Sequence, residues 1–480
     1  MDSFVEQLKR GTEEFTEESD WDEPGVKTES CSLSTIYLPF LPRHILHPTA
    51  QGRKATGFQE SKTACLNYIQ DALLENQWQR AAEFMTAYLE TLESTSVETQ
   101  MAASEVVIIS LQNRKLVIWR IGTEILCHHS KSSIEEFNYF AERIKNLGVK
   151  KYLKVCLEHA FHLLCNGLID DAYQNLSMAE GWRYGEQTAN QDKELKLIQA
   201  YKGMLDYYKW SEKRNAMLEL DSDNCAQPVE EEMHGFFRQA AVNLKEIIKI
   251  PGVWDPFVKC YVDLLEFYED YDEVRQVLSN YAYNSKFPSN PNAHVYLYQF
   301  LKRRGESKKT LMSVLKILHK IVPSHELMLE YNAMLQKSKK RKKHRLGLEV
   351  IFTVLDFAGW KEHVKAWHCL TKQIKQILEN SSKHLDWVRE EWDSRRDWWP
   401  AFHFSHHLAK RNWKENESLA CEKAWVAGIL LGNDCKYFKY VSYQGCKAKK
   451  REFQTMKKFV KKHSLAHLRT SGVLDSCMHL

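Results

Sequence analysis

The chain has 480 residues, which is enough for two to four domains or for one extended repeat array. A hydrophobic share of 44%, with 12% aromatic residues, supports a large core and excludes a mostly disordered protein. The net charge of +4 is small but unevenly distributed, because residues 1–30 carry ten acidic and three basic side chains and the last fifty residues are basic. This asymmetry predicts contact with a polyanion or an acidic partner.

Residues 1–57 are predicted to be a disordered N-terminal segment. It is acidic at first, then rich in Ser and Thr, and it is broken by Pro39, Pro42 and Pro48. It lacks the apolar core of a signal peptide, and no apolar run in the chain reaches the length of a membrane span. The twelve cysteines are scattered without a Cys-x-x-Cys pair, which predicts free thiols in a reducing compartment.

Residues 58–336 predict an all-α region of degenerate tetratricopeptide-like repeats, built from antiparallel helix pairs. Four stretches share one pattern: a turn residue, a small or β-branched residue five positions later, and apolar residues four and seven positions beyond that. The stretches begin at Asn76, Gly167, Glu269 and Gly305. The last two are 36 residues apart, close to the ~34-residue tetratricopeptide period. The first three are spaced irregularly, so we expect an imperfect array.

One segment departs from this pattern. Residues 106–109 and 116–119 are rich in β-branched and apolar side chains and flank a polar stretch. They predict a hairpin or an insertion, placed at 106–117.

The stretch 287–305 predicts a helix packed between neighbours. Pro288 and Pro291 are expected to end the preceding unit, and Asn292 to cap the next helix. Apolar residues then cover a wide face of that helix, including Tyr298 and Phe300.

Residues 337–345 are predicted to be a basic loop between two apolar helical segments. Its candidate contacts with nucleic acid or an acidic partner are Lys339, Lys340, Arg341, Lys342, Lys343 and Arg345. Lysine and arginine bind phosphates by releasing counterions. A solvated loop or a nuclear-import signal is the alternative interpretation.

Residues 346–432 form a tryptophan-rich helical region. Trp398 and Trp399 precede Pro400, which places them at a helix boundary. Large aromatic residues both fill cores and anchor interfaces. We therefore treat Trp398 and Trp399 as protein-interface candidates, with core packing as the alternative.

Residues 433–480 predict a basic C-terminal helix and tail. On a helix over about 448–463, Phe453, Met456, Phe459 and Val460 fall on one stripe surrounded by cations. The candidate contacts with phosphates or an acidic partner are Lys449, Lys450, Arg451, Lys457, Lys458, Lys461 and Lys462. No base-reading motif is present, so any nucleic-acid contact is expected to tolerate sequence changes.

Catalytic and metal-binding patterns are not found. Cys156, His159, His162 and Cys165 are each three residues apart, so on a helix they fan over about half the cylinder and cannot close around zinc. The histidines of 403–407 have no acidic or thiol partner nearby and are expected at a surface or interface. We predict no catalytic residue, no cofactor and no metal.

Five motifs carry a resemblance to a known family. They are Ile250–Val258 (IPGVWDPFV), Phe287–His294 (FPSNPNAH), Ile321–His325 (IVPSH), Leu355–Gly359 (LDFAG) and Trp398–Pro400 (WWP). They make the chain, from about residue 58 to about residue 460, similar to the A-subunit family of TATA-box-binding-protein-associated factors of RNA polymerase I. The sequence departs from the family pattern at 106–117, which looks like extra chain, and in the first fifty-odd residues.

The resemblance implies a non-enzymatic subunit of the selectivity factor that binds the ribosomal RNA gene promoter and recruits RNA polymerase I. It implies as partners the TATA-binding protein, the associated factors B, C and D, the upstream binding factor and promoter DNA. It also implies a place in the nucleus and nucleolus, away from membranes. A general helical-repeat adaptor with no direct DNA role remains the alternative.

Overall fold

The computed structural model describes residues 57–88, 118–130, 132–147, 152–182, 189–219, 226–380, 385–448 and 450–465. Every regular element in these ranges is a helix and no strand occurs in them, which confirms the all-α prediction. None of these helices is both long and apolar enough to cross a membrane. The chain divides into an N-terminal unit (residues 1–250 and 256–268) and a C-terminal unit (251–255 and 269–480), which we describe separately.

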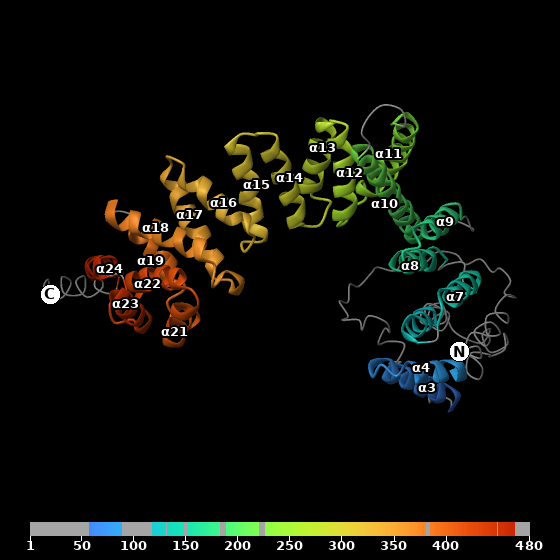
Figure 1. Cartoon of the computed structure of the whole chain (residues 1–480), viewed down its shortest axis with the longest axis horizontal. Coiled ribbons are helices and arrows are strands. Elements are labelled where there is room, and N and C mark those ends of the chain that lie inside the picture. The colour runs from blue at the N-terminus through green and yellow to red at the C-terminus, as the bar shows by residue number, and fades with distance from the viewer. Residues whose placement is uncertain are drawn as a thin grey trace, which may run out of the picture. The chain divides into compact units, whose positions relative to one another are not determined.

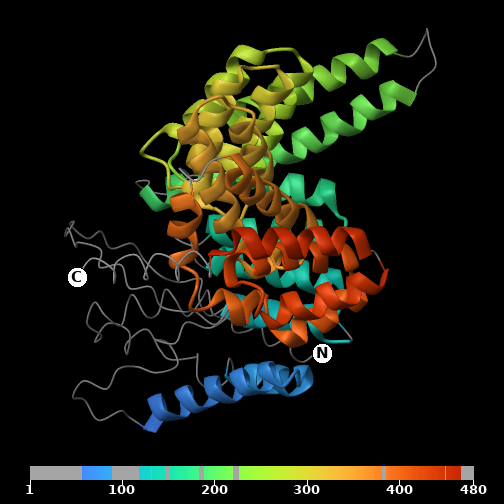
Figure 2. The same cartoon turned by 90° about the vertical axis from the view of Figure 1, so that its left-hand side faces the viewer.

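The helices of the N-terminal unit follow one another along the chain. They are α3 (Gly57–Leu74), α4 (Trp78–Ala87), a helix over 118–128, α7 (Ile134–Leu147), α8 (Tyr152–Cys165), α9 (Ile169–Glu180), α10 (Ala189–Glu219), α11 (Ala226–Ile248) and α12 (Asp255–Phe267), whose first residue belongs to the C-terminal unit. Helix α3 with α4, α8 with α9, and α10 with α11 pack as neighbours. Figure 2 shows α10 and α11 side by side as a long projecting hairpin.

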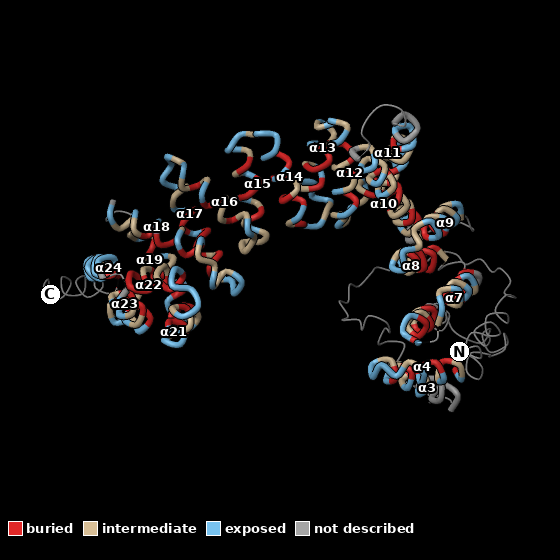
Figure 3. The backbone as a smooth tube through the Cα atoms, in the orientation of Figure 1, coloured by how far each residue is buried: buried red, intermediate tan, exposed pale blue. Residues whose placement is uncertain are grey.

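The C-terminal unit begins as a row of helices in chain order (Figure 1). The row contains α13 (Tyr271–Tyr283), α14 (Pro291–Arg303), α15 (Lys308–Ile321), α16 (Leu327–Gln336) and α17 (Arg341–Leu355). Their buried residues lie on the sides that face neighbouring helices (Figure 3). Each helix from α14 to α17 is therefore held by the helix before it and the helix after it.

A bundle closes the C-terminal unit around one large apolar cluster. It contains η3 (Ala358–Trp360), α18 (Val364–Asn380), α19 (Leu385–Asp393), α20 (Trp399–His403), α21 (His406–Glu415), α22 (Glu417–Leu431), α23 (Lys436–Ala448) and α24 (Lys450–His463). Helix α22 is apolar nearly all round and packs against α18, α21 and α23, so it is the central helix of the bundle.

The four stretches of the recurring pattern are the sharp turns between successive helices. Their first residues have left-handed backbones: φ is 58° at Asn76, 77° at Gly167, 60° at Glu269 and 70° at Gly305. In three of them the next amide donates to a carbonyl five residues back, a Schellman ending: Gln77 to Ala72 at 2.8 Å, Leu168 to Leu163 at 3.0 Å and Glu306 to Leu301 at 3.0 Å. These turns bring consecutive helices together, while a tetratricopeptide geometry stays a prediction.

The pattern predicts that the small or β-branched residue five positions after the turn residue is buried. This residue is buried in three of the four stretches. Five positions after the turn residue lie Ala81, Ala172 and Val274, all fully buried, and Thr310, which is half-buried. The small side chains allow the two helices of each pair to approach closely at the turn.

The β-prone interpretation is wrong where the structure tests it. Ile118 and Trp119 begin the helix over 118–128, and both are buried. The Trp119 ring lies against Phe137 and Phe140, at centroid distances of 5.8 and 5.5 Å. Burial of this helical face therefore outweighs the strand propensity of the residues. Residues 106–117 lie outside the described residues.

Helix α14 begins two residues earlier than the sequence predicts. Its N-cap is Asn290, not Asn292, and the Asn290 side-chain oxygen accepts the Asn292 amide at 3.0 Å. Pro291 then occupies the first helical position, where its missing N–H would have had no partner in any case. Tyr298 and Phe300 are buried, as expected for a helix between neighbours.

The carboxylate of Asp255 joins two of the family motifs. Oδ1 accepts the Tyr281 hydroxyl at 2.8 Å and the Asn290 amide at 2.6 Å, and Oδ2 accepts the Asn292 amide at 2.6 Å. The Tyr281 oxygen in turn accepts the Trp254 backbone N–H at 2.7 Å. Burial raises the pKa of Tyr281, so its phenol stays a donor. The proline-rich stretch before α14 is therefore hydrogen-bonded to the first residue of α12.

We predict that Asp255→Ala lowers the free energy of unfolding of the C-terminal unit by about 1–3 kcal/mol, because three donors lose their acceptor. Hydrogen exchange at the start of α14 should accelerate more than exchange elsewhere in that unit. The matched control, Asn292→Ala, removes one exposed donor and should have the smaller effect. Equal exchange rates in the two variants would contradict the role of the carboxylate.

Candidate nucleic-acid and protein interfaces

The basic run 337–345 is not a loop throughout. Only 337–340 form a turn, and Arg341 to Arg345 are the first residues of α17. The apolar residues that follow draw this stretch into a helix, because α17 buries Leu348, Ile351 and Phe352 in the core. The loop prediction failed because charge density indicates exposure but does not determine backbone conformation.

Two residues of the run are already engaged within the chain. Arg345 pairs with Glu390 at 2.6 Å, and Lys343 is half-buried with its Nζ 3.6 Å from Met312 Sδ. The exposed candidates are Lys339, Lys340, Arg341 and Lys342. Cations in the first turn of a helix oppose its dipole by about 0.3–1 kcal/mol each. They do not stabilise α17, and a bound anion would relieve this repulsion.

Helix α24 docks on the bundle by its apolar stripe. Phe453, Met456 and Val460 are buried against α22 and α23, and Phe459 is half-buried with its ring 5.6 Å from that of Trp425. The glycine at 445 leaves room for the ring of Phe453, since a Cβ at that position would collide with it. The stripe therefore fixes the orientation of α24 from within the chain.

The lysines of α24 lie on the side away from the bundle. Arg451, Lys457, Lys458, Lys461 and Lys462 are exposed. Among the described residues, none of the four lysines pairs with a carboxylate. Lys449 lies outside the described residues, and Lys450 begins the helix. The result is a rigid row of cations in two successive turns, suited to contact phosphates or an acidic surface.

The two adjacent tryptophans have different environments. Trp399 is fully buried and its ring contacts Trp367, Phe352 and His403. It is a core residue, so its selection as an interface candidate is wrong. Trp398 is 39% exposed, and it is the only exposed one of the eight tryptophans between residues 360 and 425, all within the described chain. Trp398 alone remains available as an anchor.

A carboxylate explains why Trp399 is buried. Asp356 Oδ1 accepts the indole N–H of Trp399 at 2.7 Å and Nε of Arg395 at 2.8 Å, while Oδ2 accepts the Arg395 guanidinium at 2.7 Å. Arg395 also donates to Glu391 at 2.7 Å. The guanidinium is almost fully buried, and these two carboxylates balance its charge.

A buried lysine lies beside this core. Lys423 of α22 has no exposed surface, and its Nζ has no hydrogen-bond partner in the described chain. The Nζ lies 5.1 Å from the centroid of the Trp367 ring. Burial, the largest cause, and the nearby cations Lys361 and Arg411 together lower the pKa of Lys423 to about 7, against the opposing effect of Glu362.

Of the three histidines in residues 403–407, His403 also lies in the core, near Lys423. His403 is buried, which corrects the expectation of a surface position, whereas His406 and His407 are exposed. His403 Nε2 lies 3.0 Å from the Leu355 carbonyl, which only accepts, so Nε2 carries the proton. Burial and the Lys423 ammonium lower the pKa of His403 to about 2, and the ring is neutral.

The cysteine–histidine spacing on α8 makes no metal site. His159 is buried with Nε2 3.0 Å from Asn138, and His162 stacks on Phe137 at 3.5 Å. No group of three His, Cys, Asp or Glu side chains in the described ranges could hold a metal ion, and the nine cysteines within them are free thiols.

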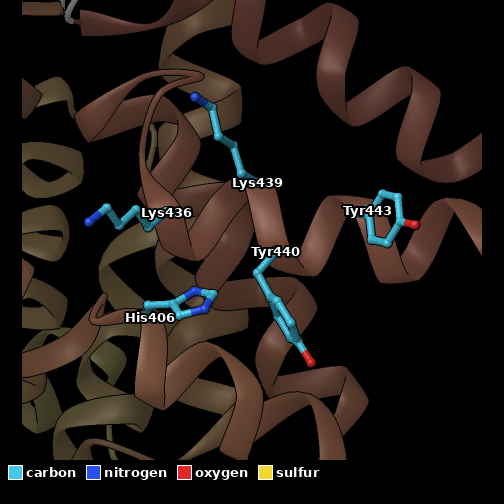
Figure 4. Close-up of a pocket in the computed structure, with 5 residues that line it drawn as sticks. All are labelled: His406, Lys436, Lys439, Tyr440 and Tyr443. Atoms are coloured by element: carbon cyan, nitrogen blue, oxygen red, sulfur yellow. The ribbon is translucent and has the colours of Figure 1, made fainter.

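A shallow hollow of about 490 Å³ lies between α21 and α23, and sequence reasoning missed it (Figure 4). Its lining residues are His406, Lys436, Lys439, Tyr440 and Tyr443. The signal was present in the spacing, because positions 436, 440, 443 and 447 fall on one face of a helix and place two tyrosines between two lysines.

The described residues define an all-α protein that exposes two groups of cations and one tryptophan. A family model for the TAF RNA Polymerase I A-subunit matches residues 71–443. The mouse TATA box-binding protein-associated factor RNA polymerase I A-subunit is 49% identical over 446 residues, covering 93% of this chain and 96% of the mouse protein. The human protein of the same name is 47% identical over 470 residues, covering 98% of this chain and all of the human protein. The chain belongs to the TAF RNA polymerase I A-subunit family.

We predict opposite outcomes for the two tryptophans. Trp399→Ala should lower the free energy of unfolding by about 3–5 kcal/mol, because it opens a cavity and leaves Asp356 with one donor fewer. Trp398→Ala should leave unfolding within about 0.5 kcal/mol of the parent, as for an exposed side chain. Thermal unfolding followed by circular dichroism measures both. A large loss of stability in the Trp398 variant would show that it too is a core residue.

The buried lysine predicts a stability that rises with pH. Its pKa is about 7 in the folded chain and ordinarily 10.5, so between these values the unfolded chain binds one proton more than the folded chain. The cost of burying the charge is therefore complete below about pH 7 and decreases as pH rises toward 10. Lys423→Met should raise the free energy of unfolding by about 1–4 kcal/mol at pH 6 and by less at pH 9. Urea unfolding at both pH values tests this, and Lys410→Met, on the exposed surface, is the control.

Proposed function

We propose that this chain is a non-enzymatic subunit of the TATA-binding-protein-containing selectivity factor that binds the ribosomal RNA gene promoter and recruits RNA polymerase I. Its partners in this proposal are the TATA-binding protein, the associated factors B, C and D, the upstream binding factor and promoter DNA. The chain acts in the nucleus, at the nucleolus. Its family membership over nearly the full length of the mouse and human relatives supports this role.

One structural observation carries the DNA-contacting part of the proposal: α24 is docked by its apolar stripe and directs Lys457, Lys458, Lys461 and Lys462 outward. Because the bundle orders the helix in advance, binding a polyanion requires no folding step. The turn before α17 supplies further exposed cations at Lys339, Lys340, Arg341 and Lys342. Both groups suit phosphates better than base edges, so this chain adds affinity and the assembled complex supplies the choice of promoter.

Trp398 is the protein-contacting part of the proposal. Its exposed ring rests on Phe402 at a centroid distance of 5.5 Å, and its neighbour Trp399 is fixed in the core. A rigid, partly exposed indole is a common interface anchor. Trp398→Ala should therefore reduce co-purification of one member of the complex at unchanged helix content, whereas loss of none would remove Trp398 from the interface.

The test of DNA contact uses the salt dependence of binding. Each neutralised phosphate of duplex DNA adds roughly 0.9 to the slope of log affinity against log salt. Changing Lys457, Lys458, Lys461 and Lys462 to glutamine should flatten the slope of the assembled complex by up to about 3–4 units, on promoter and unrelated duplexes alike. Assembly should persist, because the apolar stripe is intact.

A matched control removes the same charge elsewhere. Lys308, Lys309, Lys316 and Lys320 are located on α15, and changing all four to glutamine should leave the slope near that of the parent. Equal slopes in all three proteins would refute direct DNA contact by α24. Loss of one member of the complex, with DNA affinity unchanged, would identify an acidic protein partner instead and favour the adaptor alternative.

A further inference from the structure

The hollow between α21 and α23 combines cations with accessible aromatic rings. Lys436, Lys439 and Lys447 project from α23, which contains no acidic residue. In the described part of the chain, the acid that pairs with this face is Asp434, which lies 2.9 Å from Lys439 and leaves the three lysines with a net charge of +2. Such a charge attracts an anion, and the rings determine which kind.

The Tyr440 ring is half-buried against a neighbour, and the Tyr443 ring is open to solvent. Tyr440 packs edge-on against His406, with a centroid distance of 5.4 Å and planes at 88°. Tyr443 is 59% exposed, and the Nζ of Lys447 lies 4.5 Å from its centroid. Figure 4 shows the Tyr440 and His406 rings together and the Tyr443 ring further along α23. An exposed aromatic ring beside a cation matches the arrangement by which proteins hold a base and its adjacent phosphate.

We propose that this hollow binds a single-stranded polynucleotide. One unstacked base lies on the Tyr443 ring, and the flanking phosphates contact Lys436, Lys439 and Lys447. The volume of about 490 Å³ is within the ~300–1,000 Å³ range of small-molecule sites. The site makes no contact that distinguishes one base from another, so it tolerates sequence changes.

The aromatic content decides between this occupant and two others. A duplex buries its base faces in its own stack, so it would use the three lysines but leave the Tyr443 ring without a partner. An acidic peptide would also satisfy the lysines, but its carboxylates offer no planar face to the ring. A single strand satisfies both features at once.

This inference goes beyond the proposed duplex contact of α24 and rests on different residues. The α24 proposal concerns phosphates alone and is measured by the salt slope on duplex DNA. The proposal for the hollow is tested by the affinity of an aromatic variant of the protein for a single strand. Each proposal can therefore hold if the other fails.

The test uses the full chain and a fluorescein-labelled 20-residue oligothymidylate, followed by fluorescence anisotropy over a salt series. Tyr443→Ala should weaken binding by about 5- to 150-fold, the range that corresponds to one lost stacking partner. Tyr443→Phe keeps the ring and should bind as the parent does. Changing Lys436, Lys439 and Lys447 to glutamine should flatten the salt slope by up to about 2 units, since each single-strand phosphate contributes roughly 0.7.

Two comparisons make the result decisive. Tyr443→Ala should leave the affinity for a 20-base-pair duplex unchanged, and circular dichroism should show the helix content of the parent. Equal affinity of the parent and Tyr443→Ala for the oligothymidylate overturns the proposal. A polyglutamate peptide that displaces the oligothymidylate at equal charge concentration also overturns it, because the hollow would then be an acidic-peptide site.

Discussion

The carboxylate of Asp356 determines how the C-terminal bundle closes. It ends α17 and receives one indole N–H and two guanidinium N–H groups, all from residues about forty positions further along the chain. A buried guanidinium without its carboxylate would leave an uncompensated charge, which costs about 3–5 kcal/mol. Arg395 therefore enters the core as the partner of Asp356 and Glu391, and Trp399 shares the Asp356 carboxylate. The position of the large apolar cluster depends on this one polar contact.

The C-terminal unit uses the same arrangement twice. Asp255 accepts from a phenol of α13 and from two amides at the start of α14. Asp356 likewise accepts from a guanidinium in the turn after α19 and from an indole at the start of α20. A third motif is joined similarly, since the Trp360 indole donates to the Ser324 carbonyl at 2.7 Å. The unusual motifs by which the family is recognised are thus the joints of a helical scaffold. Residues such as Asp255 and Trp399 hold segments together, whereas Trp398 in the same motifs is exposed.

The elements that the sequence could predict are those governed by local rules. Turns at Gly167 and Gly305 follow from the freedom of glycine at positive φ, and the docked stripe of α24 follows from helical periodicity. The difference between Trp398 and Trp399 could not be predicted, because it depends on the distant Asp356. Lys423 was missed for a related reason: a lysine in sequence indicates exposure, and only the packing around α22 reveals its burial. The spacing of lysines and tyrosines places them on one face of α23. The sequence alone does not show that this face is left uncovered by the other helices.

The sharp left-handed turns have a consequence for how the chain acquires its structure. They make most helix contacts local in sequence, which lowers the contact order and favours rapid folding. Helix pairs from α3 onward can close one after another as they leave the ribosome. The contacts of the bundle are less local in sequence. Helix α18 packs on α22, and Asp356 binds Arg395 and Trp399, which lie about forty residues further along the chain. Closure of the bundle needs longer loops of chain, so we expect it to be slower than the pairing of neighbouring helices.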